Sequence, residues 1–468
     1  MTDRIDAFSG IALVIAWFTL LVTSLSGEAG QALAEGAPSP LMLFGMAGIL
    51  FYLVAQSTRY TRFVWSHLTF GAVITVIALF GLASPVMALA EAFWRSVFIV
   101  VLFSSLGVLR VAAQTSPMVR EAGAMLVRQP PGRRYFALAG GSTLFGAILN
   151  FGVIALFSGM IRDAVKAAPG DATVARARER RMLLAMLRGF SVTMFWCPLT
   201  VAFAITTTGI AGAQWPSMVL IGAGLAVMTA IAGWAIDSGA SRRAAGTGDA
   251  VPFSFAALVP LVTLLLILSS TAALVERFTP GALIHGVILF VPLIGLVWIL
   301  RDTGRAGLTH LRRYVVEQAP GQRQELSVLA NAAYAGTLIG MLLPQIFIDA
   351  LIGPQGLPPV FVPALFMLLV VLFGLLGANP LITVAVLASV MADPARYGVD
   401  ATLVATALAI GWGMAIASSP ATAATMYIGR LTGYGSFTVG TRWNAGYAAV
   451  SVVMLGAALT LLGLWRGA

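Results

Sequence analysis

Residues 402–429 read TLVATALAIGWGMAIASSPATAATMYIG, a stretch that is long enough to cross a lipid bilayer and contains no charged residue. A proline, Pro420, stands within it. A proline inside a helix removes one backbone donor and clashes with the preceding turn, so the helix unwinds at that point. The sequence therefore predicts a membrane-spanning helix that is interrupted near Pro420.

The rest of the chain is equally apolar. Of its 468 residues, 59% are hydrophobic and only 10% are charged, and the mean hydropathy is +0.93. Soluble domains carry about 25% charged residues, so this composition predicts a polytopic α-helical protein of a bacterial-type inner membrane. The expected crossings are 9–27, 40–57, 65–84, 93–110, 182–209, 216–236, 253–275, 281–300, 326–348, 402–429 and 443–465.

The positive charges predict the orientation. With the N-terminus in the cytoplasm and the C-terminus outside, 24 of the 28 lysines and arginines fall in cytoplasmic segments. Such an asymmetry is typical of membrane proteins and accounts for the net charge of +10 without a nucleic-acid partner.

Two further apolar segments must begin and end on the same side of the membrane for this orientation to hold. Segment 136–161 is flanked by arginines on both sides, and segment 360–392 is too long for one comfortable crossing. We expect re-entrant helical hairpins at both places, the first entering from the inside and the second from the outside. Their tips have to be buried in protein or line a wet cavity.

The chain then divides into two halves of opposite orientation. Residues 1–39 are expected to add a peripheral helix, and residues 237–252 to form a cytoplasmic linker. The halves, 40–236 and 253–465, each read as three spans, a hairpin and two spans. Interrupted helices at corresponding places of two inverted repeats are the best sequence indication of a transporter's binding site.

Short motifs support the pairing of the two halves. Cys197-Pro198-Leu199-Thr200 follows the first hairpin, and Ser419-Pro420-Ala421-Thr422 follows the second. A glycine stands nine residues before each proline, at Gly189 and Gly411. The hairpins contain Gly141-Ser142-Thr143 and Ala378-Asn379-Pro380, which we expect to lie at the two tips.

This pattern of inverted halves, two hairpins and two broken helices resembles the divalent anion–sodium symporter family of the ion transporter superfamily, over residues 40–465. In that family each tip carries a Ser-Asn-Thr motif that contacts substrate and sodium, and the two tip sequences above keep part of it. The resemblance implies an elevator-type secondary transporter, a homodimer, a small anionic substrate and sodium as the coupling ion. It implies no other cofactor.

The candidate binding residues are polar or helix-breaking residues at the expected tips and breaks. They are Ser142, Thr143, Asn150, Cys197, Pro198, Thr200, Asn379, Pro380, Ser418, Ser419, Pro420 and Thr422. Arg188, about 15 Å before Pro198 along the helix, is expected to extend to the cytoplasmic surface.

The alternatives are less well supported by the sequence. An exporter or a sodium–proton antiporter of the same superfamily is the second interpretation, but no acidic residue lies near either break, which weakens proton coupling. A channel or scaffold subunit is the third. An enzyme is not expected, because the sequence shows no clustered nucleophile, base or metal-ligand set. ATP-driven pumping is not expected either, because the sequence has no nucleotide-binding glycine-lysine motif. The single cysteine excludes an intrachain disulfide.

Overall fold

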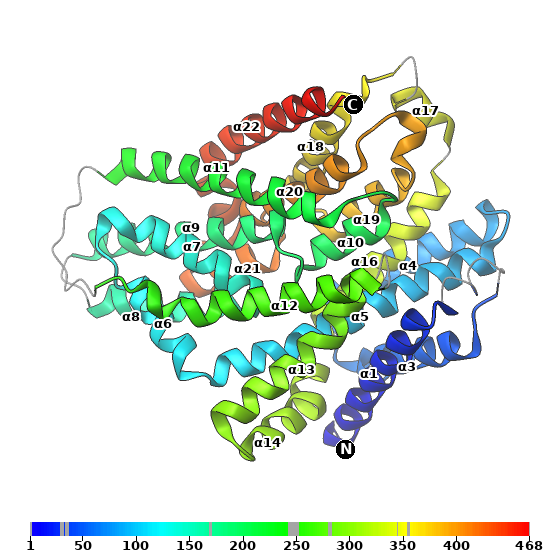
Figure 1. The fold of residues 1–468 in the computed structure, drawn as a ribbon, viewed down its shortest axis with the longest axis horizontal. Helices are drawn as coiled ribbons and strands as arrows, with labels where there is room; N and C mark the ends of the chain where they lie inside the picture. The colour runs from blue at the N-terminus through cyan, green and yellow to red at the C-terminus, as the bar shows by residue number, and fades with distance from the viewer. Residues whose placement is uncertain are drawn as a thin grey trace. The chain divides into compact units, whose positions relative to one another are not determined.

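The computed structural model describes residues 2–28, 32, 37–167, 171–241, 252–278, 283–343, 345–352 and 356–467. These residues form helices and connecting segments, with no strand among them (Figure 1). The predicted linker 237–252 lies mostly outside the described residues, and its first part continues helix α11 to Ser241.

Eleven helical segments in the described part of the chain are long and apolar enough to cross a membrane, and each coincides with one expected crossing. The prediction of a helical multi-pass membrane protein is therefore confirmed. The segments are Arg4–Leu25, Pro40–Arg59, Arg62–Gly81, Pro85–Thr115, Ala172–Gly209, Trp215–Ser238, Val259–Phe278, Leu283–Thr303, Arg323–Leu342, Ala401–Thr432 and Thr438–Arg466.

The helices separate into two compact units. The first comprises residues 1–116 and 266–348, and the second comprises residues 117–265 and 349–468. The boundaries between the units cut across the two predicted repeats, because each unit takes part of each repeat. The repeats themselves stay a prediction.

In the first unit the long helix α5 (Pro85–Thr115) is the central element. It packs against α13 (Leu283–Thr303) and α16 (Arg323–Leu342), and α16 also contacts α4 (Arg62–Gly81). The N-terminal helix α1 (Thr2–Leu25) packs against α3 (Pro40–Gln56). The other helices that lie mostly in this unit are α12 (Val259–Phe278), α14 (Ala306–Arg313) and α15 (Ala319–Gly321). The boundary after Ile348 divides α17 (Gln345–Ile352) between the units.

The second unit is built around two helices whose apolar stretches are almost entirely buried. They are α9 (Ala172–Trp196) and α20 (Ala401–Ser418). The apolar stretch of each of these two crossings is 94% buried, whereas two other crossings, Arg62–Gly81 and Val259–Phe278, are only 22% buried. The apolar core around them draws on α11, α18 and α22 as well. The other helices of this unit are α6 (Pro117–Val127), α7 (Pro131–Leu149), α8 (Gly152–Ala167), α10 (Val201–Gly209), α11 (Trp215–Ser241), α18 (Val362–Leu375), α19 (Pro380–Val390), α21 (Ala423–Thr432) and α22 (Trp443–Arg466).

Both apolar segments that were expected to turn back do form helical hairpins. Helices α7 and α8 make the first hairpin, and α18 and α19 make the second. The arms have 19, 16, 14 and 11 residues, so those of the second hairpin are shorter than the roughly 20 residues that span a bilayer. Their re-entry into the membrane stays a prediction.

Candidate functional site

The first interrupted helix ends at Trp196 and resumes at Val201 as α10. Pro198 has no N–H, so the carbonyl of Met194 loses its regular helical donor. Thr200 begins α10 as its N-cap: its hydroxyl accepts a hydrogen bond from the Phe203 N–H at 3.3 Å and donates to the Cys197 carbonyl at 2.9 Å. The predicted break at Pro198 is thus present, and Cys197 and Thr200 are both buried.

The second interrupted helix has a richer set of hydrogen bonds. Pro420 deprives the Ile416 carbonyl of its donor, and the Thr422 hydroxyl replaces that donor at 3.3 Å. Thr422 also accepts from the Thr425 N–H and so caps α21. Threonine hydroxyls therefore take the place of the missing backbone donors at this break.

Two more threonines, which are not among the residues predicted from the sequence, complete this arrangement. Thr425 donates to the Ser419 carbonyl at 2.9 Å, and Thr441 donates to the Ser418 carbonyl at 3.0 Å. Thr441 lies in a π-helical turn far along the chain, so its approach to the break could not be read from spacing.

The tip of the first hairpin lies at Asn150 and Phe151, between α7 and α8. The expectation that Ser142 and Thr143 form this tip is wrong, because α7 continues past them to Leu149. The Asn150 backbone has a φ of +52°, and it is the one described residue other than glycine with a positive φ. Its side chain is buried, and its amide oxygen has no hydrogen-bond partner.

Ser142 and Thr143 instead lie in the first arm of the hairpin. The Thr143 hydroxyl donates to the Gly189 carbonyl at 2.7 Å, which ties α7 to α9. Ser142 is fully buried and its hydroxyl has no partner.

The tip of the second hairpin lies where it was predicted. Gly377 has φ +94° and turns the chain between α18 and α19. The half-buried Asn379 then caps α19, because its side chain accepts a hydrogen bond from the Leu381 N–H at 3.0 Å. Pro380 is the first residue of α19, a position where its missing N–H costs nothing.

The two hairpins pack on the two broken helices in matching ways. Gly189 of α9 lies directly against the Ala139 backbone of α7, and a Cβ atom on Gly411 of α20 would lie 2.9 Å from the Met367 carbonyl oxygen of α18. Seven residues further along each first arm, Gly146 faces Thr193 and Gly374 faces Ala415. Both facing residues stand five positions before the proline of their helix.

The second arms cross over between the two halves. Helix α19 of the second hairpin packs against α10, which follows the first break, whereas α8 of the first hairpin packs against α21, which follows the second break. The broken helices also contact each other, since Gly413 of α20 lies against Ser191 and Phe195 of α9. Such reciprocity is expected of two inverted halves, and it brings the helix breaks and hairpin arms into one unit.

Arg188 was expected to extend to the cytoplasmic surface, and this is wrong. Only 5% of its surface is exposed, and its Nε donates to the Asn444 side-chain oxygen at 3.0 Å. The residues that surround Arg188 come from α7, α11 and α22. Sequence reasoning missed this cluster because nothing in the spacing links Tyr135, Gly233 or Tyr447 to α9.

No protein-family model and no curated protein sequence matches the chain. Among solved structures, it is similar to the YdaH transporter of Alcanivorax borkumensis, with a TM-score of 0.54 and 18% sequence identity, covering 86% of this chain and 97% of that chain. It is also similar to Neisseria gonorrhoeae MtrF, which is described within a class of antimetabolite efflux pumps, with a TM-score of 0.51 and 14% identity, covering 85% of this chain and 94% of that chain.

These likenesses concern the fold, and at such low identity they carry no residue from one protein to the other. The closer resemblance to the divalent anion–sodium symporter family stays a prediction. What the helices and the two similar structures support together is a multi-pass membrane protein with the fold of membrane transporters.

Proposed function

We propose that the chain is a secondary active transporter that carries a small organic anion across a bacterial inner membrane, coupled to sodium. The observation that carries the proposal is the reciprocal arrangement of two proline-broken helices and two helical hairpins inside one unit. Broken helices in corresponding positions are the arrangement with which transporters hold substrates and ions near the middle of the membrane.

The chemistry of the breaks favours an anion together with a cation. Helices α10, α21 and α19 begin at Thr200, Thr422 and Asn379, and the N-terminus of a helix carries partial positive charge and free N–H groups. Helix N-termini of this kind attract a carboxylate or a similar group. Ser418, Ser419 and Cys197 are buried beside the breaks, and we assign them to the wall of the proposed binding region.

The first hairpin tip favours sodium as the coupling ion. The Asn150 amide oxygen is buried without a donor, and carbonyl oxygens of this kind coordinate hard cations. Residues 131–161, 182–236, 360–392 and 401–468 contain no aspartate or glutamate, so no carboxylate in these segments could bind and release a proton. We therefore assign sodium rather than a proton to this site.

The division into two units supports an elevator mechanism. The unit of residues 117–265 and 349–468 holds both hairpins and both broken helices, whereas the other unit holds none of them. In the proposed mechanism the unit that holds the hairpins and broken helices moves with its substrate, and the other unit stays fixed in a homodimer. The N-terminus faces the cytoplasm and the C-terminus the outside, as the positive charges predict.

A thermal-shift screen tests the binding step. Purified protein is incubated with mono- and dicarboxylates, each with sodium chloride and with choline chloride. A ligand of the native state raises the unfolding temperature, and we expect at least one anion to do so more strongly with sodium. Counterflow in proteoliposomes then distinguishes the transporter from a channel, because only a carrier shows saturable uptake that internal substrate accelerates.

Export is the second candidate function, and the description of MtrF within a class of efflux pumps favours it. Vesicles of opposite orientation distinguish import from export. If the anion accumulates only in inside-out vesicles, the chain is an exporter. If an outward sodium gradient then fails to stimulate this accumulation, another ion drives the export.

A further inference from the structure

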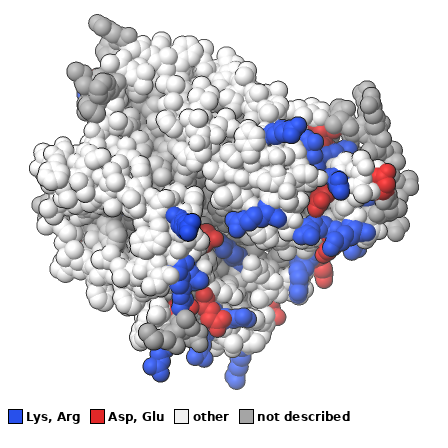
Figure 2. All heavy atoms as spheres, turned by 180° about the vertical axis from the view of Figure 1, so that it is seen from behind, with Lys and Arg blue, Asp and Glu red and all other residues white. Residues whose placement is uncertain are grey.

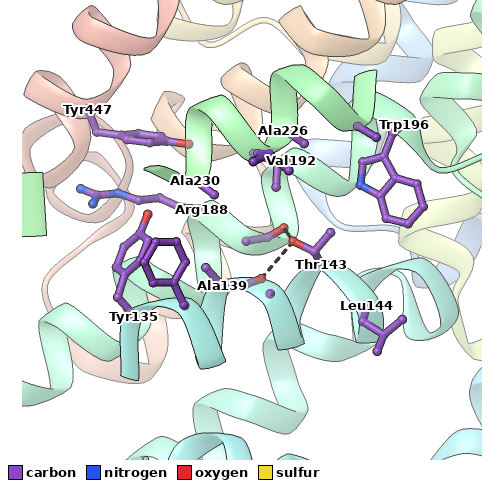
Figure 3. A pocket seen from close by; sticks show the side chains of 15 residues that line it. Tyr135, Ala139, Thr143, Leu144, Arg188, Val192, Trp196, Ala226, Ala230 and Tyr447 are labelled. Carbon is purple, nitrogen blue, oxygen red and sulfur yellow. Dashed lines mark hydrogen bonds between the residues drawn. The ribbon is translucent and has the colours of Figure 1, made fainter. Parts of the chain in front are cut away.

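A cavity of about 370 Å³ lies within the unit of residues 117–265 and 349–468 (Figure 3). Its walls come from α7, α9, α11 and α22. The volume is at the lower end of the range that ligand pockets occupy. The cavity is therefore large enough for a small molecule or for the end of a lipid.

Arg188 supplies a buried positive charge at this cavity. Its guanidinium donates to two neutral acceptors, the Asn444 side-chain oxygen at 3.0 Å and the Gly233 carbonyl at 3.5 Å, and it stacks on the Tyr447 ring with 4.4 Å from its central carbon to the ring centre. No ion pair to Arg188 exists among the described residues. A buried charge normally has a counter-ion, so this one calls for an anion from outside the chain.

Tyr135 adds a second polar group next to the charge. Its side chain is 4% exposed, and its hydroxyl makes no hydrogen bond of regular geometry, although it lies close enough to Arg188 to interact with its charge. In Figure 3 the Arg188 side chain runs between Tyr447 and Tyr135. A buried hydroxyl without a hydrogen-bond partner costs free energy unless a ligand or a water molecule forms a hydrogen bond with it.

The rest of the cavity is apolar. Its wall continues from Arg188 along α9 through Val192 to Trp196, a distance of about 12 Å on a helix, and Phe136 and Leu144 face it from α7. The hydroxyl of Thr143 is already engaged with α7 and α9 backbone carbonyls. A ligand of this cavity therefore needs an anionic head and an apolar body.

The surroundings of the cavity add further positive charge. Arg180 lies close enough to Arg188 and to Arg442 to interact with the charge of each, whereas Asp237 is held by an ion pair with Arg181. Figure 2 shows lysines and arginines, with aspartates and glutamates among them, beside a broad area without charged side chains. The charge of Arg180 near Arg188 favours the approach of an anion.

We propose that this cavity is a binding site for an amphiphilic anion, with a carboxylate or phosphate head at Arg188 and Tyr135 and an apolar body along Val192 and Trp196. Two sources share this chemistry: a free long-chain carboxylate and an anionic phospholipid of the bilayer. The site does not depend on the proposed transport function, because it lies beside α9 and uses none of the residues that cap the broken helices.

Binding of cis-parinarate, a fluorescent long-chain carboxylate, to the full chain in phosphatidylcholine nanodiscs tests the site. After subtraction of the signal of empty nanodiscs, we expect saturable binding. Arg188→Gln should weaken it by at least about tenfold, the effect of losing a charge-assisted hydrogen bond. Arg176→Gln removes one exposed charge from the same helix, about 18 Å before Arg188, and should leave the affinity unchanged.

Two variants keep the test decisive if Arg188→Gln fails to fold. Ala230→Phe fills the cavity at a half-buried position and leaves Arg188 in place, so it should abolish saturable binding. Arg188→Lys retains the charge but loses the planar fork, and should bind more weakly than the natural protein. Equal affinity of the natural protein and Ala230→Phe, or no saturable binding by either, would overturn the proposal.

The composition of the nanodisc identifies the source of the ligand. If phosphatidylglycerol in the nanodisc competes with cis-parinarate, and does so only when Arg188 is present, the natural ligand is an anionic phospholipid. If decanoate competes and phosphatidylglycerol does not, the ligand is a free carboxylate. Competition that is the same in Arg188→Gln would count against a head-group site at this arginine.

Discussion

Gly189 of α9 lies directly against the backbone of Ala139 in α7, so that no side chain fits between the two helices at this point. Gly411 makes the corresponding approach to Met367 in the second hairpin. Small residues that allow backbones to approach are the usual means by which helices associate in a membrane, where lipid removes the hydrophobic driving force. The two glycines therefore fix how each hairpin is seated on its broken helix.

The first prediction follows from this contact. Gly189→Ala places a methyl group against the Ala139 backbone and should lower the free energy of unfolding by about 1–3 kcal/mol, the usual cost of overpacking. The thermal unfolding temperature of the purified protein measures the effect. Gly159→Ala is the matched control, because a Cβ atom there meets no atom within 4 Å. Alanine has a higher helix propensity than glycine, so this variant should have unchanged or higher stability. Equal stability of both variants would show that the contact is not tight.

The second prediction concerns the strained tip at Asn150. Asn150→Gly permits the positive φ at no steric cost, so the protein should fold with unchanged stability, but the buried amide is lost. We expect sodium-dependent stabilisation by the anion to disappear in this variant. Asn150→Ala keeps the Cβ atom that strains the natural asparagine at φ +52°, so it should be about 1–2 kcal/mol less stable than Asn150→Gly.

Thermal unfolding with and without sodium separates the two effects at this tip. If sodium-dependent stabilisation persists in Asn150→Gly, the side-chain amide oxygen of Asn150 does not bind the ion. The backbone strain would then have only a structural role.

The sequence was sufficient to predict the spans and breaks because these depend on local chemistry. An apolar run of bilayer length predicts a crossing wherever it occurs, and Pro198 and Pro420 interrupt their helices for reasons contained in the residue itself. The Gly-to-Pro spacing of nine residues also corresponds to a real contact, that of Gly189 and Gly411 with the first arms of the hairpins.

The position of the first tip could not be predicted in the same way. Gly141-Ser142-Thr143 was paired with the second tip because the two short sequences are similar, but a helix accepts small residues anywhere along its length. The packing of Gly146 and Gly374 shows the correct register, in which Asn150 falls close to the position of Asn379. Arg188 was missed for a related reason: its partner Asn444 lies more than 250 residues away.

A third prediction tests the hydrogen bonds at the second break. Thr422→Val keeps the shape of the side chain but removes the donor to the Ile416 carbonyl and the cap of α21, and it should cost about 1–2 kcal/mol. Thr422→Ser restores the hydroxyl and should recover most of the loss. Thr432→Val is the control, since that hydroxyl only returns to its own helix at Ile428, and it should be nearly neutral in the unfolding measurement.

The last prediction separates binding from folding at the proposed substrate site. Asn379→Ala removes the cap of α19 at a half-buried tip, where water replaces part of the lost hydrogen bond, so the cost in stability should stay near 1 kcal/mol. Counterflow of the anion should fall by at least about tenfold, because the N-terminus of α19 is then no longer held in place beside the first break. Asp400→Ala removes the cap of a helix that begins elsewhere in the same unit, and it should lower stability by a similar amount without this loss of transport. If both variants reduce counterflow equally, the effect of Asn379 is one of stability, and the second tip is not part of the substrate site.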